Sequence, residues 1–254
     1  MKLQPSSHPS GAARVEPTAA HAWRLSIPAG TGGAYRLAQL DDYRRLPRRA
    51  FLWQPPLRFS LAARVSQPDL PGTWGFGLWN DPFNASLGLG GAARRLPALP
   101  NCAWFFHASP ANYLSLRDDL PASGFLVATF AAPPLPSGLL ALALPLLPGL
   151  ACKPAARLMR RAARRVIRQD AARLDLDVTG WKRYTIDWLP QRAIFAVDGR
   201  TVLETTCSPR GRLGAVLWID NQYAAFTPRG EVRFGTQPNP AAWLEIASAE
   251  IQQI

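Results

Sequence analysis

GWKRYTIDWLPQRAIFAVDGRTVLE, residues 180–204, contains three short segments with the composition and spacing of β-strands. In the first segment, residues 184–188, the apolar side chains Tyr184, Ile186 and Trp188 alternate with polar ones. This period of two is typical of a half-buried strand, because successive side chains point to opposite faces of a sheet. The stretch therefore predicts β-structure.

A tight turn joins the second and third of these segments. Asp198 and Gly199 lie between the apolar run of residues 193–197 and the β-prone residues 201–205. An Asp-Gly pair is favoured in two-residue hairpin loops, because both central residues must adopt positive φ. We therefore expect an antiparallel hairpin here.

Two stretches of the chain resemble signatures of one protein family. YTIDWLPQRAIFAVDG, residues 184–199, resembles a segment of glycoside hydrolase family 16 and the concanavalin A-like lectin/glucanase superfamily. Residues 57–83, LRFSLAARVSQPDLPGTWGFGLWNDPF, resemble a second signature of that family. The resemblance covers about residues 50–131 and 175–254, in the correct order. It implies an antiparallel jelly-roll sandwich that acts on or binds polysaccharides.

The rest of the chain fits an all-β fold, an antiparallel β-sandwich with a helical, Leu-rich and Arg-rich insertion. Many short strands with Gly/Pro turns are typical of sandwiches, and the chain has 25 prolines and 19 glycines. Further strands are expected at residues 23–27, 34–39, 57–66, 102–108, 111–116, 124–131, 213–220 and 243–251. We expect residues 1–20 to form a disordered tail. Residues 21–254 should form one jelly-roll domain, interrupted by residues 132–174.

The nine tryptophans of the chain are candidates for sugar contacts, although such rings also fill the cores of sandwiches. The resemblance implies that the aromatic strand within residues 72–83, GTWGFGLWNDPF, lines the concave face of the sandwich. The candidate carbohydrate-binding residues are Trp74, Phe76, Trp79, Trp104, Phe106, Trp218 and Tyr223. Strand alternation places Trp74 and Phe76 on one face and Trp79 on the other.

The catalytic carboxylates that the resemblance implies are missing. A retaining glycosidase needs two carboxylates about 5–5.5 Å apart, and the family supplies them from one strand as Glu-x-Asp-x-x-Glu. No glutamate occurs between Glu16 and Glu204, and the strand expected at that position, residues 102–108, reads CAWFFHA. This absence favours a degenerate, non-catalytic member of the group.

Four other residues are weak catalytic candidates: Asp81, His107, Asp118 and Asp119. Adjacent strand residues point to opposite faces, so Asp118 and Asp119 do not form the usual dyad, and a turn is favoured. Asp81 suits a turn cap better than a substrate contact. A lone histidine such as His107 is more often a hydrogen-bonded structural residue than a catalyst.

The insertion has two unlike halves. Residues 135–150, LPSGLLALALPLLPGL, are interrupted by prolines and are shorter than the about 20 apolar residues of a membrane-spanning helix. Residues 154–174 predict an amphipathic helix with arginines on one face and apolar residues on the other. The arginines of that face are Arg157, Arg160, Arg161, Arg164, Arg165 and Arg168.

Much of the basic charge of the protein lies on this predicted helix. Residues 153–173 carry eight basic residues and one acid, whereas the whole chain has a net charge of +12. The helix either packs on the sandwich with a solvated arginine face or lies on an anionic membrane surface beside the Leu-rich segment. Nucleic acid is not favoured as a partner, because the helix has no aromatic residue.

No metal site or cofactor is predicted. The three cysteines include no C-x-x-C pair, and the phosphate-binding glycine motifs do not occur. Sparse cysteines fit a reducing compartment, and residues 1–20 lack the apolar core of a secretion signal. We therefore expect a cytoplasmic protein, with peripheral attachment to a membrane surface as a second expectation.

These observations favour a non-catalytic module that binds a carbohydrate or a glycolipid, or that serves as an interaction module. The alternative is a glycoside hydrolase that cleaves the O-glycosyl bonds of a polysaccharide with a displaced set of carboxylates.

Overall fold

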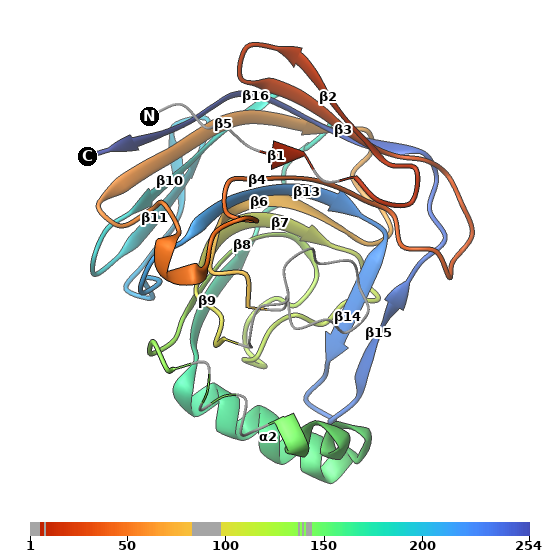
Figure 1. The fold of residues 1–254 in the computed structure, drawn as a ribbon, viewed down its shortest axis with the longest axis vertical. Coiled ribbons are helices and arrows are strands. Elements are labelled where there is room, and N and C mark those ends of the chain that lie inside the picture. The colour runs from red at the N-terminus through yellow and green to blue at the C-terminus, as the bar shows by residue number, and fades with distance from the viewer. Residues whose placement is uncertain (1–5, 8, 83–97, 137, 139, 141–143) are drawn as a thin grey trace.

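The computed structural model describes residues 6–7, 9–82, 98–136, 138, 140 and 144–254. Within them, two seven-stranded antiparallel sheets pack face to face, which confirms the expected β-sandwich (Figure 1). The inner sheet consists, in spatial order, of β1 (Ser6–Ser7), β4 (Leu37–Asp41), β13 (Gly214–Asp220), β6 (Thr73–Trp79), β7 (Cys102–Ala108), β8 (Gly124–Ala131) and β9 (Arg168–Arg173). The outer sheet consists of β12 (Arg200–Thr205), β11 (Ala193–Val197), β10 (Lys182–Trp188), β5 (Leu57–Val65), β16 (Ala242–Gln253), β3 (Ala22–Ile27) and β2 (Arg14–Ala19).

The smaller elements lie around these sheets. They are the strands β14 (Gln222–Phe226) and β15 (Val232–Thr236), the 3-10 helices η1 (Arg48–Ala50) and η2 (Leu144–Ala151), and the helix α2 (Lys153–Val166). The inner sheet is curved, and α2 and the β14–β15 hairpin lie on its concave side (Figure 1). The concave face is therefore flanked by the helical insertion.

The opening stretch of the sequence forms the predicted strands. β10 pairs with β5 on one side and with β11 on the other, with Tyr184 opposite Val197. Asp198 and Gly199 adopt φ values of 49° and 79°, as the hairpin between β11 and β12 requires. The predicted hairpin is confirmed.

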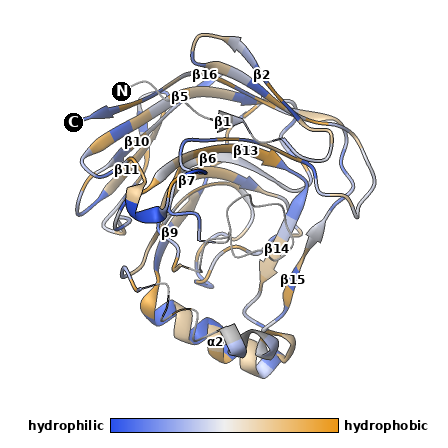
Figure 2. Ribbon diagram, viewed as in Figure 1, coloured by the Kyte–Doolittle hydropathy of each residue, from blue (hydrophilic) through white to orange (hydrophobic). Residues whose placement is uncertain are grey.

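The core lies between the two sheets. β5 alternates buried and more exposed side chains along its whole length, as its sequence predicts. From the facing strands, the ring of Phe76 lies 4.9 Å from that of Tyr184, and the ring of Phe105 lies 5.5 Å from that of Phe195. Hydrophobic and hydrophilic residues alternate along β5 of the outer sheet (Figure 2), whereas nearly all residues of β7 and β8 in the inner sheet are buried. Interlocking rings of this kind fix the sheets against each other.

The structure corrects two expectations outside the core. Arg14–Ala19 forms the edge strand β2, paired with β3, where the sequence predicted a disordered tail. Most of the side chains of β2 are exposed, so it has none of the alternation that reveals a strand in a sequence. Residues 111–116, predicted as a strand, lie in a loop in which Tyr113 makes one isolated bridge to Ala225.

The predicted basic helix is real but shorter. α2 ends at Val166, and Arg168–Arg173 continues as β9, which pairs with β8 at the edge of the inner sheet. Helix periodicity continues past residue 166 in the sequence, but the unpaired edge of β8 offers a full ladder of hydrogen bonds, so tertiary context overrides local propensity. The insertion therefore ends before β9. Residues 137, 139 and 141–143 of the Leu-rich segment lie outside the described residues, and among those described no helix is long and apolar enough to cross a membrane.

Candidate functional site

The candidate site is the concave face of the inner sheet, and strand alternation decides which predicted residues line it. Trp74 and Phe76 belong to the core between the sheets, where each is almost fully buried. The prediction that they line the cleft is therefore wrong, because their parity on β6 points them towards the outer sheet. Trp79, of the opposite parity, lies on the concave side with Trp104.

Four of the predicted residues form one aromatic cluster on this face. The ring of Trp104 lies 5.9 Å from Trp79, 5.3 Å from Phe106 and 5.6 Å from Trp218. We call Trp79, Trp104, Phe106 and Trp218 the concave cluster. Its three tryptophans are partly exposed, whereas Phe106 is buried.

Two glycines of β6 make room for the concave cluster. A Cβ on Gly75 would lie 2.8 Å from both Phe106 and Trp218, and a Cβ on Gly77 would lie 2.6 Å from Trp104. The Trp218 ring therefore lies directly over Gly75, and the Cβ atoms of Phe106 and Trp104 on β7 lie close to Gly75 and Gly77. Sequence analysis missed this role, although the alternate glycines of TWGFGLW are a visible signal for a close approach to a strand.

The chain itself covers part of the concave cluster. Leu114 and Leu120, from the loop between β7 and β8, pack on Phe106 and its neighbours. Leu99 and Leu116 pack beside Trp79 and Trp104. The loop is fixed to the β14–β15 hairpin, since the Asn112 side chain accepts a hydrogen bond from the backbone N–H of Ala224. The face is thus a partly covered aromatic surface.

A chain of hydrogen bonds fixes one ring of the concave cluster. Trp218 Nε1 donates to Thr73 Oγ1 at 2.8 Å, and Thr73 Oγ1 donates to Asp220 Oδ1 at 2.9 Å. Asp220 is buried, and burial raises its pKa from 3.8 to about 7. By contrast, the buried Nε1 atoms of Trp79 and Trp104 have no hydrogen-bond partner among the described residues. Both atoms are buried, so the rings of Trp79 and Trp104 present carbon atoms rather than their N–H groups to the solvent.

The last predicted aromatic residue, Tyr223, lies apart from the concave cluster. It is on β14, paired with Gly235 of β15, and a Cβ on Gly235 would lie 3.1 Å from its ring. Tyr223 is partly exposed and makes no ring contact with the tryptophans among the described residues. It flanks the concave face rather than forming its floor.

Solved structures of carbohydrate-active enzymes share this architecture. A family 16 endo-glucanase from Bacteroides ovatus aligns with a TM-score of 0.50 at 9% identity, over 98% of this chain and 94% of its own. An endo-β-1,4-glucuronan lyase from the fungus Trichoderma reesei aligns with a TM-score of 0.49 at 10% identity, over 100% and 91%. The chain has the lectin/glucanase fold. No family model and no curated protein matches the sequence, so the likeness concerns the fold alone.

On this lectin/glucanase sandwich, β7 presents no carboxylate to the concave side. The positions that share the concave side with Trp104 and Phe106 are Cys102 and Ala108. Two acids of neighbouring strands share this side, Asp41 of β4 and Asp220 of β13. Asp41 lies opposite Val216, which is four residues from Asp220, so about 13 Å of strand separates the two acids. This exceeds the separation of a glycosidase pair.

The weak catalytic candidates have structural roles. Asp118 accepts hydrogen bonds from Arg160 and Arg164, each at 2.7 Å, and these contacts lower its pKa. Asp119 pairs with Arg117 instead, which lowers the pKa of Asp119. The two carboxylates therefore lie in a surface loop with separate arginine partners and form no dyad.

Asp81 and His107 are also held by the fold. Asp81 is buried in the turn after β6 at a φ of 50°, and its backbone carbonyl accepts a hydrogen bond from Arg48. His107 stacks on Trp74 in the core and lies 3.0 Å from the carbonyl oxygen of Leu70. Burial lowers the pKa of His107, which favours the neutral ring. His107 therefore has the hydrogen-bonded structural role that the sequence favours for a lone histidine, and its parity on β7 points the ring inwards.

The six arginines predicted for one solvated face are divided by the structure. Arg160 is buried, with 3% of its side chain exposed, and it donates to the carbonyl oxygens of Ser115 and Phe226 at 2.8 Å. Its guanidinium also lies 5.4 Å from the ring of Tyr113. Arg168 lies on β9 and donates to Thr206. Only four of the six, Arg157, Arg161, Arg164 and Arg165, are exposed on α2.

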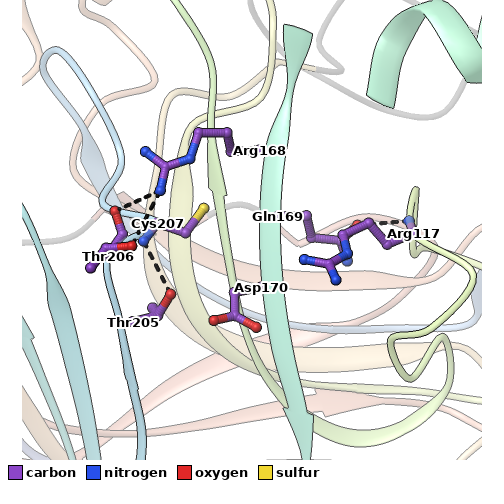
Figure 3. Close-up of a pocket in the computed structure, with 7 residues that line it drawn as sticks. All are labelled: Arg117, Arg168, Gln169, Asp170, Thr205, Thr206 and Cys207. Carbon is purple, nitrogen blue, oxygen red and sulfur yellow. Dashed lines mark hydrogen bonds between the residues drawn. The ribbon is translucent and has the colours of Figure 1, made fainter. Parts of the chain in front are cut away.

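A cavity of about 210 Å³ lies at the edge of the sandwich beside β9, not over the concave cluster (Figure 3). It is lined by Arg117, Arg168, Gln169, Asp170, Thr205, Thr206 and Cys207. Its polar groups are partly satisfied within the protein, since Arg168 donates to Thr206 and the Cys207 N–H donates to Thr205. Burial raises the pKa of the Cys207 thiol, so this cysteine is not an activated nucleophile.

Proposed function

We propose that the protein is a non-catalytic carbohydrate-binding module whose ligand stacks on the concave cluster. The observation that carries this proposal is the group of three partly exposed tryptophans, in which the Trp104 ring contacts those of both Trp79 and Trp218 and the Trp218 ring lies over Gly75. Flat aromatic surfaces suit sugar rings, because the apolar face of a sugar packs on an aromatic ring while its hydroxyls remain hydrogen-bonded.

The fixed orientation of Trp218 supports the same function. Its Nε1 donates to Thr73 Oγ1 at 2.8 Å, so this ring is held in place before a ligand arrives. Among the residues that the structure describes, the two strand acids of the concave side, Asp41 and Asp220, lie too far apart for a glycosidase pair, which supports binding without hydrolysis. A carbohydrate or a glycolipid headgroup is the class of ligand that this chemistry fits.

Affinity electrophoresis tests the proposal. The protein is run through gels that contain a soluble mixed-linkage β-glucan, a galactan or no polysaccharide, and a ganglioside is tested by thermal shift. We expect retardation or stabilisation by at least one probe, reduced at least tenfold in Trp218→Ala and Trp104→Ala. Trp181→Ala is the matched control, because Trp181 is an exposed tryptophan outside the concave face.

Two results would count against the proposal. Absence of any response to all the probes removes the binding function. Release of reducing sugar from either polysaccharide by the wild-type protein supports the alternative, a glycoside hydrolase with displaced carboxylates. The Trp→Ala variants are checked by circular dichroism, so that lost folding is distinguished from lost binding.

A further inference from the structure

The side of α2 that packs on the rest of the protein is not its most apolar side. Its buried positions are Ala156 and Arg160, with Ala163 partly buried and Ile167 buried just beyond its end. These residues lie three or four apart, so they form one seam along the helix. The seam contains an arginine, and the larger apolar residues of α2 are elsewhere.

The outward side of α2 carries an exposed apolar line. Leu158, Ala162 and Val166 are four residues apart, so their side chains follow one line on the helix surface. Leu158 is 67% exposed and Val166 is 43% exposed. A line of exposed apolar side chains on one helix face is a candidate surface for contact with a partner.

A basic line runs directly beside the apolar one. Arg157, Arg161 and Arg165 have the same spacing of four residues, and all three are exposed. They have no ion-pair partner among the described residues. By contrast, Arg160 and Arg164 both pair with Asp118, and Lys153 pairs with Glu231. α2 has no acidic residue of its own.

We propose that this outward face of α2 docks on the surface of an anionic lipid bilayer. The apolar line enters the boundary between headgroups and acyl chains, and the basic line contacts the lipid phosphates. Charge complementarity decides the occupant, because three unpaired arginines beside a continuous apolar line match a surface that is both anionic and apolar. A protein groove offers no such general match, and a nucleic acid offers no apolar layer.

The position of α2 in the fold agrees with this orientation. The helix lies at one end of the molecule, on the concave side and away from the outer sheet (Figure 1). The contacts of Arg160 with Ser115, Phe226 and Asp118 fix α2 to the loop and hairpin beside the concave cluster. Docking through α2 therefore holds the concave side towards the membrane. This inference does not depend on glycan binding.

Vesicle co-sedimentation of the full chain tests the inference. The vesicles contain phosphatidylcholine alone or phosphatidylcholine with about one-third phosphatidylserine. We expect binding to the anionic vesicles only. The triple variant R157Q/R161Q/R165Q should bind about 100-fold more weakly, since each basic residue near such a surface contributes close to a factor of five. R14Q/R183Q/R200Q is the matched control, because it removes three exposed arginines from the outer sheet.

A second variant distinguishes a bilayer from other polyanions. L158Q/V166Q keeps every charge but removes the apolar line, and we expect it to weaken vesicle binding about tenfold or more. Leu52→Gln is its control, because Leu52 is 48% exposed outside the insertion. Equal binding of wild type and both α2 variants overturns the inference. Binding of duplex DNA that L158Q/V166Q leaves unchanged, with no vesicle binding, also overturns it and identifies a nucleic-acid surface.

Discussion

The concave cluster and the outward face of α2 both expose apolar side chains, but the fold supports them differently. In the concave cluster, the Trp218 ring lies over Gly75, and the ring of Trp104 lies beside those of Trp79, Phe106 and Trp218. In the apolar line of α2, Leu158 and Val166 are largely exposed, and the helix is held to the protein by the hydrogen bonds of Arg160. The rings of the first surface therefore hold one another in place, whereas the apolar side chains of the second are covered only by a partner.

The burial of Arg160 follows from the groups that surround it. The loop and the β14–β15 hairpin present the carbonyl oxygens of Ser115 and Phe226 to α2, and buried carbonyls need donors. A guanidinium has five N–H donors in a planar fork, and its stem is apolar. Leucine in this position would fill space but leave these acceptors unpaired. The structure therefore assigns the arginine to the inside and the leucine to the outside.

The largest predicted effect is the pH dependence of Asp220, which supports the Trp218 ring of the concave cluster. A pKa raised from 3.8 to about 7 means that the folded state holds the proton more tightly than the unfolded state. Its stabilising effect is complete below about pH 4 and disappears as the pH rises through about 7. The shift corresponds to about 4 kcal/mol in the free energy of unfolding.

Urea unfolding of wild type and Asp220→Asn at several pH values measures this effect. The amide does not titrate, so the stability of wild type relative to the variant should fall by about 4 kcal/mol between about pH 4 and pH 8. Other titrating groups, such as His107, are present in both proteins and cancel. A difference that stays constant with pH would contradict a raised pKa.

Arg160→Met tests the seam of α2. The substitution keeps an unbranched apolar stem but leaves the carbonyl oxygens of Ser115 and Phe226 unpaired. We expect a loss of about 3 kcal/mol in the free energy of unfolding, because buried polar groups lose their partner. Arg161→Met, one residue along the helix and exposed, is the control and should change stability by less than about 0.5 kcal/mol.

Gly75→Ala tests the floor of the concave cluster. The new methyl group would lie 2.5 Å from the carbonyl oxygen of Phe105 and 2.8 Å from the Trp218 ring, so the backbone or the ring must shift. We expect a cost of about 1–3 kcal/mol and a change in near-ultraviolet circular dichroism from the displaced tryptophan. Gly180→Ala is the control, since its nearest atom would lie 3.8 Å away. Unchanged stability and spectrum would mean that the rings are not packed on β6.

Leu158→Gln should give the smallest effect. Because 67% of this side chain is exposed, its replacement removes little buried area, and we expect a stability change within about 0.5 kcal/mol. In most helices the loss of a leucine lowers the free energy of unfolding more than the loss of an arginine. We expect the reverse in α2, where Arg160→Met should cost more than Leu158→Gln. A large loss of stability in Leu158→Gln would show that this leucine is packed against the protein. The outward face of α2 would then be supported by the fold, as the concave cluster is.

The period-2 strands were predictable from the sequence because each carries its own signal. β7, β8 and β11 begin and end at the predicted residues, and the Asp198-Gly199 turn has the expected backbone. β2 and the β14–β15 hairpin were missed, because edge and satellite strands with mixed exposure lack alternation. These segments become strands because they form hydrogen bonds with neighbouring strands, and their own sequences do not show it.

The candidate site was predictable only in part. Alternation separated Trp79 from Trp74 and Phe76, but it could not say which parity faces the outer sheet. The structure placed Trp74, Phe76 and His107 in the core and left Trp79 with the concave cluster. Trp104 and Trp218 were predicted for the concave side, and the structure brings them within 5.6 Å of each other.

The sequence by itself determined strands that carry their own pattern, such as β5 and β10, the turn between β11 and β12, and the amphipathic character of α2, because these depend on neighbours along the chain. The tertiary structure decided where α2 ends, since the edge of β8 captures Arg168–Arg173 as a strand. It also decided which sides of β6, β7 and α2 are buried. Periodicity divides an element into two faces, but only the groups packed against it determine which face turns inwards, as the carbonyls around Arg160 do.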